Sequence, residues 1–446
     1  MKRHLLPIIA IFFSTSFLAQ SIVWSGSVEG MGIASTKDYN PFWFYTNTAT
    51  QVGSASNFSG LGRLESAYTI TENASLTAGA SFFYRDEVKD EFQRNDLFLQ
   101  FQNSWIKATV GAKTAQKVQY GLSATNKNIL FSNNTRPFPG LLLEANNPIK
   151  LSETFSVDWG IGHFVLNDDR FVDNVKLHYK RVALHIDFKN NNRVRAQIQH
   201  YVQWGGTSPE YGKLKSDFNA FIDVFTARKS SEIGTDGELF NAVGNHLGSY
   251  LLEYGFKNNV GNFSMYHDHP FEDGSGTAFA NFPDGAWGAY FEPAKSKIVT
   301  AFLYEFITTN NQSKGGVGAD NYFSNAIYRS GWTYEQNIIG LPFIMVDPTV
   351  EISPENNSII SNRVIAHHFG FAGTVKGFLW EVKSSSIKSL GRYSNPFPKA
   401  IKTFNNYLSI KYPTQEYGTF HLFGGIDTSN IIDTVMGAGL GYSYKF

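Results

Sequence analysis

The sequence predicts an all-β protein: a transmembrane outer-membrane β-barrel of about eighteen antiparallel strands, with a short helical insert closing the mouth. Three observations support this prediction. The chain opens with an export signal and then lacks an apolar run long enough for a transmembrane helix. It is rich in aromatic residues and poor in charged ones. Its apolar and polar residues alternate over strands longer than those of globular proteins, which favours a barrel over a soluble array of β-sandwiches.

The first twenty residues have the pattern of a cleaved signal peptide. Lys2 and Arg3 precede an apolar stretch, residues 5–18, that is too short to cross a bilayer as a helix. Residue 19 or 20 is the predicted cleavage point, so residues 21–446 form the mature barrel. We therefore expect export to the outer membrane of a Gram-negative-type bacterium, with outer-membrane lipid around the barrel.

The composition excludes several classes of protein. Lysine and arginine number 38, as do aspartate and glutamate, so net charge gives no reason to expect nucleic acid as a partner. The absence of cysteine excludes disulfides and a lipid anchor on cysteine. Aromatic residues make up 15 % of the chain and charged residues 17 %, as is typical of membrane barrels. We expect a monomer without a cofactor.

Two stretches show the alternation clearly. In residues 193–204, RVRAQIQHYVQW, the apolar residues share one face and arginines and glutamines share the other. In residues 435–446, VMGAGLGYSYKF, large apolar side chains alternate with small ones, and the chain ends on the aromatic Phe446. Strands of roughly 9–12 residues match a tilted crossing of the hydrocarbon layer. A terminal aromatic residue on the lipid face resembles the insertion signature of outer-membrane barrels.

Short and long connections also alternate along the chain, as expected when short periplasmic turns oppose long outer loops. The predicted short turns are 71–73, 103–104, 152–154, 190–192, 257–259, 293–296, 374–377 and 413–416. The predicted outer loops are 35–60, 86–94, 114–140, 167–173, 205–246, 269–283, 309–361, 387–403 and 427–433. Nine outer loops imply about eighteen strands. The strand at 141–151 is the least regular.

The inward face of the predicted barrel carries charges of both signs. They are Arg63, Glu65, Lys107, Lys113, Asp158, Asp187, Arg193, Arg195, Glu253, Glu305, Glu381, Lys383 and Lys411. Such charges either pair and close the lumen or line a water channel, and a barrel of this width allows both.

The outer loop 205–246 contains an amphipathic helix. Its segment SDFNAFIDVFTAR (216–228) places Phe218, Phe221, Ile222 and Phe225 on one helical stripe, and a weaker helical pattern follows at 238–243. Because this stripe must be buried, we expect the helix to plug or cap the barrel mouth. A helix that docks a partner is the alternative.

Several motifs in the central region resemble one family. They are HYVQWGGTSPEYG (200–212), GNHLGSYLLEYGF (244–256), YHDHPFEDGSG (266–276), NFPDGAWG (281–288), LYEFITTNNQS (303–313) and SNRVIAHHFGF (361–371). Together they resemble the capsule-assembly Wzi family of outer-membrane proteins. The resemblance implies an eighteen-stranded barrel with a closed lumen. It also implies a lectin that anchors capsular or other surface polysaccharide at the cell surface without polymerising or exporting it, and it brings no catalytic motif.

The segment 266–276 concentrates histidines and carboxylates in one outer loop. We interpret His267, His269, Glu272 and Asp273 as a structural clasp, because a loop that folds into a barrel mouth must satisfy many backbone groups. A metal site on His267 and His269 is the alternative. An acid–base centre is less favoured, since no nucleophile motif accompanies it.

A polysaccharide needs aromatic faces for its sugar rings and polar groups for its hydroxyls. The predicted binding residues are Tyr328, Arg329, Trp332 and Tyr334 in loop 309–361, with Lys388, Arg392 and Tyr393 in the basic loop 387–403. The competing interpretation is that these aromatic residues belong to the loop core or to the aromatic girdle at the membrane interface. For the whole protein, a porin or substrate-specific channel is the main functional alternative, and an outer-membrane hydrolase is a more distant one.

Overall fold

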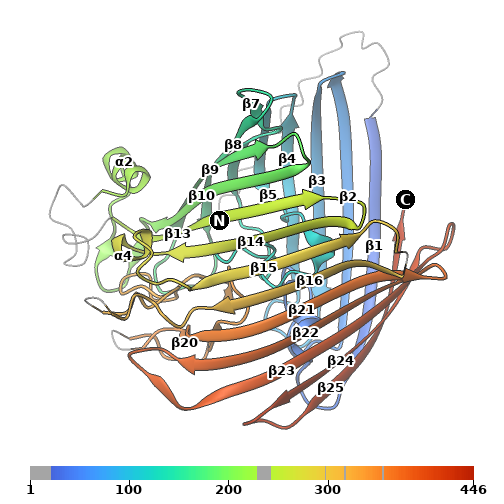
Figure 1. The fold of residues 1–446 in the computed structure, drawn as a ribbon. Coiled ribbons are helices and arrows are strands. Elements are labelled where there is room, and N and C mark those ends of the chain that lie inside the picture. The colour runs from blue at the N-terminus through green and yellow to red at the C-terminus, as the bar shows by residue number, and fades with distance from the viewer. Residues whose placement is uncertain (1–21, 229–242, 297, 316–317, 354–355) are drawn as a thin grey trace, which may run out of the picture.

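The computed structural model describes residues 22–228, 243–296, 298–315, 318–353 and 356–446. The predicted signal peptide and most of the second helical pattern, 238–243, lie outside these residues. The described strands form one closed antiparallel barrel (Figure 1), because β1 (Ile22–Ser35) pairs with both β2 (Phe58–Thr71) and β25 (Val435–Lys445).

The barrel has eighteen strand positions within the described residues. Its sheet contains nineteen strand segments, but two of them, β6 (Gly140–Ala145) and β7 (Ile149–Lys150), pair one after the other with β8 (Phe155–Leu166) and share a position. The other strands are β3 (Ala74–Arg85), β4 (Phe92–Gln102), β5 (Ile106–Ala112), β9 (Val175–Asp187), β10 (Asn192–Trp204), β13 (Asn245–Lys257), β14 (Gly261–Phe271), β15 (Gly285–Pro293), β16 (Val299–Thr308), β21 (Val364–Val375), β22 (Phe378–Gly391), β23 (Pro396–Pro413) and β24 (Thr419–Ser429). The predicted eighteen-stranded barrel is confirmed.

The predicted turns agree closely with the structure. All eight predicted short turns fall between paired neighbouring strands, and the least regular predicted strand, 141–151, is the one that is interrupted between β6 and β7. One outer loop differs. The predicted loop 387–403 is only the turn 392–395, because β22 and β23 continue to pair as far as Gly391 and Pro396.

Side-chain exposure confirms which face of each strand meets lipid. Along β25, Met436, Leu440 and Tyr442 are exposed on the outer face, while the glycines between them face inward. At Gly439 a Cβ would lie 2.1 Å from the Phe423 ring, so the inner wall has no room for a side chain there. The alternation therefore reflects lipid outside and a filled interior.

The part of the lumen nearest the long loops contains a hydrophobic core formed by loop residues. Side chains from the outer loops 36–57, 113–139 and 309–363 pack together against inward residues of the wall such as Tyr201 and Ile307. Trp332 is fully buried at its centre and donates a 2.6 Å hydrogen bond from Nε1 to the carbonyl of Leu130. This core lies inside the barrel rather than between sheets, so the loops close the mouth.

The predicted helix is present as α2 (Phe218–Thr226), and Asp217 caps it by accepting a 2.9 Å bond from Ala220 N. Its position differs from the predicted plug. Ala220 and Val224 pack on Val202 and Trp204, which point outward from β10. The helix therefore lies on the outer surface of the wall, beside the ends of β9 and β10 (Figure 1). The physical reason is that other loops already fill the lumen, whereas the wall offers an apolar surface at its rim.

No helix in the described part of the chain is long and apolar enough to span a membrane. Three short hairpins, β11 (Thr207–Ser208) with β12 (Gly212–Lys213), β17 (Thr333–Tyr334) with β18 (Asn337–Ile338), and β19 (Met345–Val346) with β20 (Ile359–Ser361), stiffen the outer loops. The remaining short elements are α1 (Phe42–Tyr45), η1 (Gln119–Gly121) and α4 (Gly274–Thr277).

Candidate functional site

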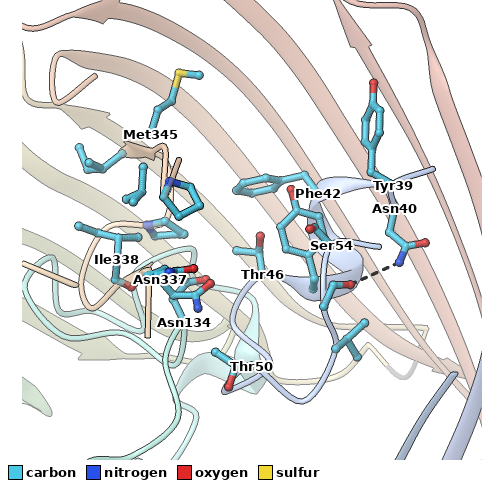
Figure 2. A pocket seen from close by; sticks show the side chains of 18 of the residues that line it. Tyr39, Asn40, Phe42, Thr46, Thr50, Ser54, Asn134, Asn337, Ile338 and Met345 are labelled. Atoms are coloured by element: carbon cyan, nitrogen blue, oxygen red, sulfur yellow. Dashed lines mark hydrogen bonds between the residues drawn. The ribbon is translucent and has the colours of Figure 1, made fainter. Parts of the chain in front are cut away.

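A cavity lies at the end of the barrel that carries the long loops. Its volume is about 860 Å³, within the range that ligand sites occupy. One side is formed by the first outer loop, 36–57, and the opposite side by residues 335–348 (Figure 2). The upper ends of β22, β23 and β24 complete the wall. We call this cavity the mouth pocket.

Two glycines on neighbouring strands position α1 at the mouth pocket. A Cβ on Gly425 would lie 2.8 Å from the Phe44 ring, and one on Gly437 would lie 2.9 Å from the same ring. Phe44 therefore lies directly on the backbone of the wall. Asp427 fixes the start of the helix by accepting a 2.6 Å bond from Phe42 N. This arrangement turns the side chains of Phe42 and Tyr45 toward the cavity.

The opposite side of the mouth pocket is held by ion pairs. Arg136 binds both carboxylate oxygens of Glu335, and Glu335 N donates a 2.8 Å bond to Asp168. Arg170, which is buried, lies 3.2 Å from the other oxygen of Asp168. Bidentate arginine–carboxylate pairs fix geometry as well as charge. Residues 335–338 are therefore a firm wall.

Several residues that line the mouth pocket carry a polar atom without a hydrogen-bond partner among the described residues. Thr50 Oγ1, Gln93 Oε1 and Arg85 Nε are buried and have no hydrogen-bond partner among the described residues. Buried polar atoms of this kind are uncommon in folded proteins. Tyr39, which is 38 % exposed, adds an accessible aromatic ring on the same side as Asn40 (Figure 2). Aromatic faces beside hydrogen-bonding groups suit a polyhydroxyl ligand.

The charge of the mouth pocket differs from that of the predicted basic face. Its lining includes the acidic residues Asp90, Asp168, Asp169, Glu335 and Asp427 against only Arg85 and Lys89. Burial raises the pKa of the Asp168 carboxyl above its usual value of 3.8, and the neighbouring Arg170 opposes that effect. Because Arg136 and Arg170 behind the lining pair with Glu335 and Asp168, the cavity is polar with little net charge.

The aromatic residues predicted to bind polymer in loop 309–361 lie elsewhere. Tyr328, Trp332 and Tyr334 are at most 2 % exposed, and they form the loop core inside the barrel. Arg329 is also buried and lies 2.5 Å from Glu210, with its guanidinium over the Phe171 ring. The loop-core interpretation describes these residues, because large aromatic side chains from several loops bury one another at the mouth.

The residues predicted in 387–403 do not form one basic face with that loop. Lys388 points outward from β22, whereas its neighbours Ile387 and Ser389 line the mouth pocket. Arg392 is buried. Tyr393 donates a 2.5 Å bond to the carbonyl of Asn310 and is covered by Arg363. Continued pairing of β22 with β23 separates these side chains onto opposite faces of the wall.

Three of the four residues of the predicted clasp, His269, Glu272 and Asp273, contact backbone groups of the outer loops, whereas His267 lies in β14. His267 stacks on Trp287 at 3.7 Å between ring centroids, and His269, fully buried, lies 3.0 Å from the carbonyl of Asp284. Glu272 accepts a 2.6 Å bond from Phe323 N, and burial raises its pKa well above the ordinary value. Asp273 caps α4 through Ser275 N. The described residues contain no cluster of three or more histidines or carboxylates that could hold a metal.

Asp284 connects the outer loops 269–284 and 309–363, and we expect its carboxyl to make the stability of their packing depend on pH. It accepts bonds of 2.9 and 2.7 Å from Asn311 N and Gln312 N, and burial raises its pKa from 3.8 to about 6. A carboxyl whose pKa is raised by folding stabilises the fold below its unfolded pKa, and that contribution is lost as pH rises through about 6.

We therefore expect limited proteolysis of loop 309–363 to be faster at pH 8 than at pH 5. Asp284→Asn, which cannot ionise, should reduce this difference between the two pH values. The matched control is Asp433→Asn, because Asp433 is exposed and its pKa is lowered by Lys37. An unchanged pH difference in Asp284→Asn would contradict the assignment.

A buried glutamate holds loop 113–139 inside the lumen. Glu305, which is fully buried, accepts bonds of 2.7 Å from Ser123 Oγ, 2.8 Å from Ala124 N and 2.5 Å from Tyr266 OH. Lys127 of the same loop pairs with Glu253 at 2.5 Å. The inward charges of the wall also pair with their neighbours, as in Lys107–Glu144 at 3.0 Å and Arg181–Asp158 at 2.7 Å.

Reasoning from the sequence missed the first outer loop as a part of the site. Residues 38–48, DYNPFWFYTNT, are aromatic and rich in side chains that bond to hydroxyls. That composition, in a predicted outer loop, was the available signal. The close fit of Phe44 on two glycines of β24 and β25 could be seen only in three dimensions.

Comparison with known proteins agrees with the architecture. Residues 41–343 match the family described as Capsule assembly protein Wzi, which is more than half of the chain. The structure of Wzi from Escherichia coli, described as an outer membrane protein involved in group 1 capsule assembly and a carbohydrate-binding β-barrel, is similar with a TM-score of 0.62 and 12 % identity. That similarity covers 94 % of this chain and 84 % of Wzi.

Two outer-membrane structures of Pseudomonas aeruginosa are similar at a TM-score of 0.50. OccK5 (OpdH) has 10 % identity and covers 95 % of this chain and 98 % of its own; OccK3 (OpdO) has 11 % identity and covers 95 % of each. At these identities the likeness concerns the fold alone. No curated protein matches the sequence significantly.

Proposed function

Because the chain belongs to the Wzi family of capsule assembly proteins and folds as an outer-membrane β-barrel, we propose that it binds a surface polysaccharide and anchors it to the cell. The observation that carries this proposal is the mouth pocket. It is a cavity on the outer side, of a size suited to a few sugar units, and it joins aromatic rings to polar groups that lack partners.

Its charge suggests which polymers fit. Because the charges in and directly behind the lining nearly balance, the mouth pocket favours neutral segments over runs of carboxylated sugars. Amide and hydroxyl groups such as those of Asn134, Asn337 and Thr46 supply both donors and acceptors for sugar hydroxyls (Figure 2). Each site binds a short segment weakly, and a repeating polymer that engages many barrels is retained firmly.

The filled mouth argues against the alternative of a porin. The loop core and the part of loop 113–139 that Glu305 binds occupy the lumen. Inward charges of the wall, such as Arg181 and Asp158, form ion pairs with one another. Three of the five lining carboxylates, Asp168, Glu335 and Asp427, are engaged by a loop backbone amide or an arginine, which disfavours hydrolysis by these three. We infer a binding protein that leaves its polymer intact.

The direct test is surface retention in a deletion strain. Removal of the gene should leave polysaccharide synthesis unchanged while polymer moves from the cell pellet to the medium, and restoration of the gene should return it to the cell. Cell-bound polymer that stays at the wild-type amount in the deletion strain would reject the proposal. Bilayer conductance of the purified protein should be negligible, whereas steady channels would favour the porin.

A further inference from the structure

A second cavity lies on the outside of the barrel, between α2 and the wall. Its volume is about 500 Å³, and its apolar lining is Leu141, Leu143, Ile161, Phe218 and Phe221. We call it the α2 groove. The strand residues Leu143 and Ile161 belong to the outward face, because Glu144, next to Leu143, and Asp158, three positions before Ile161, form ion pairs inside the lumen. The groove therefore opens toward the membrane.

The helix itself remains partly uncovered. Ala220 and Val224 are buried against the wall, but Phe218, Ile222 and Phe225 form an exposed stripe, and Phe218 is 74 % exposed. On the wall, the exposed residues Val182 and Ile198 continue the apolar surface toward the centre of the strands. A helix with one face on protein and an apolar stripe outward is typical of the boundary between head groups and acyl chains.

The polar lining of the α2 groove consists of Trp204, Lys176, His163, His178, Ser216 and Asp217, whose carboxylate caps α2. Trp204 is 3 % exposed, and its Nε1 has no hydrogen-bond partner among the described residues. Lys176 Nζ lies 4.6 Å from the centroid of the same ring and donates to the carbonyl of Ser216 at 3.3 Å. A buried indole N–H usually has an acceptor. An acceptor supplied by a ligand would also lie close to the lysine.

From this geometry we propose that the α2 groove is a binding site for one outer-leaflet lipid. An acyl chain lies along the apolar lining, its ester or amide carbonyl accepts a hydrogen bond from Trp204 Nε1, and its anionic head group lies near Lys176. The chemistry required is that of an acylated anionic lipid, and a free phosphate lacks the chain that fills most of the cavity. The site would fix α2 to the membrane surface beside the mouth.

The test uses the full-length barrel in mild detergent and native mass spectrometry. The probes are hexa-acylated lipid A and, as a zwitterionic lipid, dioleoylphosphatidylcholine. We expect one tightly held lipid A per wild-type barrel and at least tenfold weaker binding of the phosphatidylcholine. Leu141→Trp should fill the groove and weaken lipid A binding at least tenfold. Trp204→Phe, which keeps a ring but loses the donor, should weaken it about fivefold.

The matched control is Leu252→Trp, because Leu252 is exposed on the same outward wall but does not line the groove. It should bind lipid A as the wild type does. Equal binding of the two lipids by the wild type, or unchanged binding by Leu141→Trp, would overturn the proposal and indicate ordinary annular lipid. Polysaccharide binding should be unaffected by Leu141→Trp, so the two proposals fail independently.

Discussion

Glu305→Leu is expected to convert the closed barrel into an ion-conducting channel. Glu305 is the buried acceptor for Ser123, Ala124 and Tyr266, and leucine leaves all three donors without a partner in the lumen. Each charge-assisted bond contributes about 1.5–3 kcal/mol. Together the three bonds amount to several kcal/mol, so the part of loop 113–139 around Ser123 and Ala124 should leave its place and open a path for ions.

Planar-bilayer recording measures this effect directly. The wild type should show negligible conductance, and Glu305→Leu should show steady or flickering channels under the same voltage. Protease cleavage within 113–139 should become faster in parallel. The two readouts separate a displaced loop from a barrel that fails to assemble, since a misassembled protein gives no channel and loses its heat-modifiable migration in gels.

Glu292→Leu provides a matched control for this substitution. Glu292 also faces inward and accepts a 2.7 Å bond from a tyrosine, Tyr290, but it holds only strand residues and contacts no outer loop. Its replacement should leave the bilayer silent. Channels in Glu292→Leu, or silence in Glu305→Leu with the barrel intact, would show that Glu305 is not what holds the mouth closed.

The barrel could be predicted because its determinants are local. Alternation along strands such as β10 and β25, and turn residues at each short connection, depend on neighbours in sequence and on the contrast between lipid and lumen. The predicted loop 387–403 is largely strand in the structure, and this error also arose from reliance on local alternation. Residues 387–403 alternate less clearly, since above the membrane the outward face of a strand meets water, as at Lys388 and Lys402, and no longer needs apolar side chains.

The site was harder to predict because the burial of an aromatic residue in a loop depends on residues distant in sequence. Trp332 and Tyr334 are of the residue types that bind sugar rings, yet loops distant in sequence cover both. The position of α2 also depends on residues distant in sequence. The loop core occupies the lumen, and α2 packs on the outer surface of the wall instead. Composition identified which residue types a polysaccharide needs, and packing decided which of them remain accessible.

Thr403→Trp is expected to abolish polysaccharide retention while leaving the barrel intact. Thr403 is half-buried, points inward from β23 and lines the mouth pocket. An indole at this position occupies volume that a sugar ring would use, so affinity for a polymer segment should fall at least tenfold. Since retention depends on many weak contacts at once, the loss on whole cells should exceed the loss measured for a short segment.

The next residue along the strand supplies the control. Phe404 is exposed on the lipid-facing side, so Phe404→Trp adds an indole to the same strand without entering the mouth pocket. Cells carrying Phe404→Trp should retain polymer as the wild type does, while cells carrying Thr403→Trp should release it to the medium as the deletion strain does. If both variants retain polymer equally, the mouth pocket is not the binding site. The exposed outer rim around Lys388 and Lys402 then becomes the next surface to test, because it is basic and faces away from the cavity.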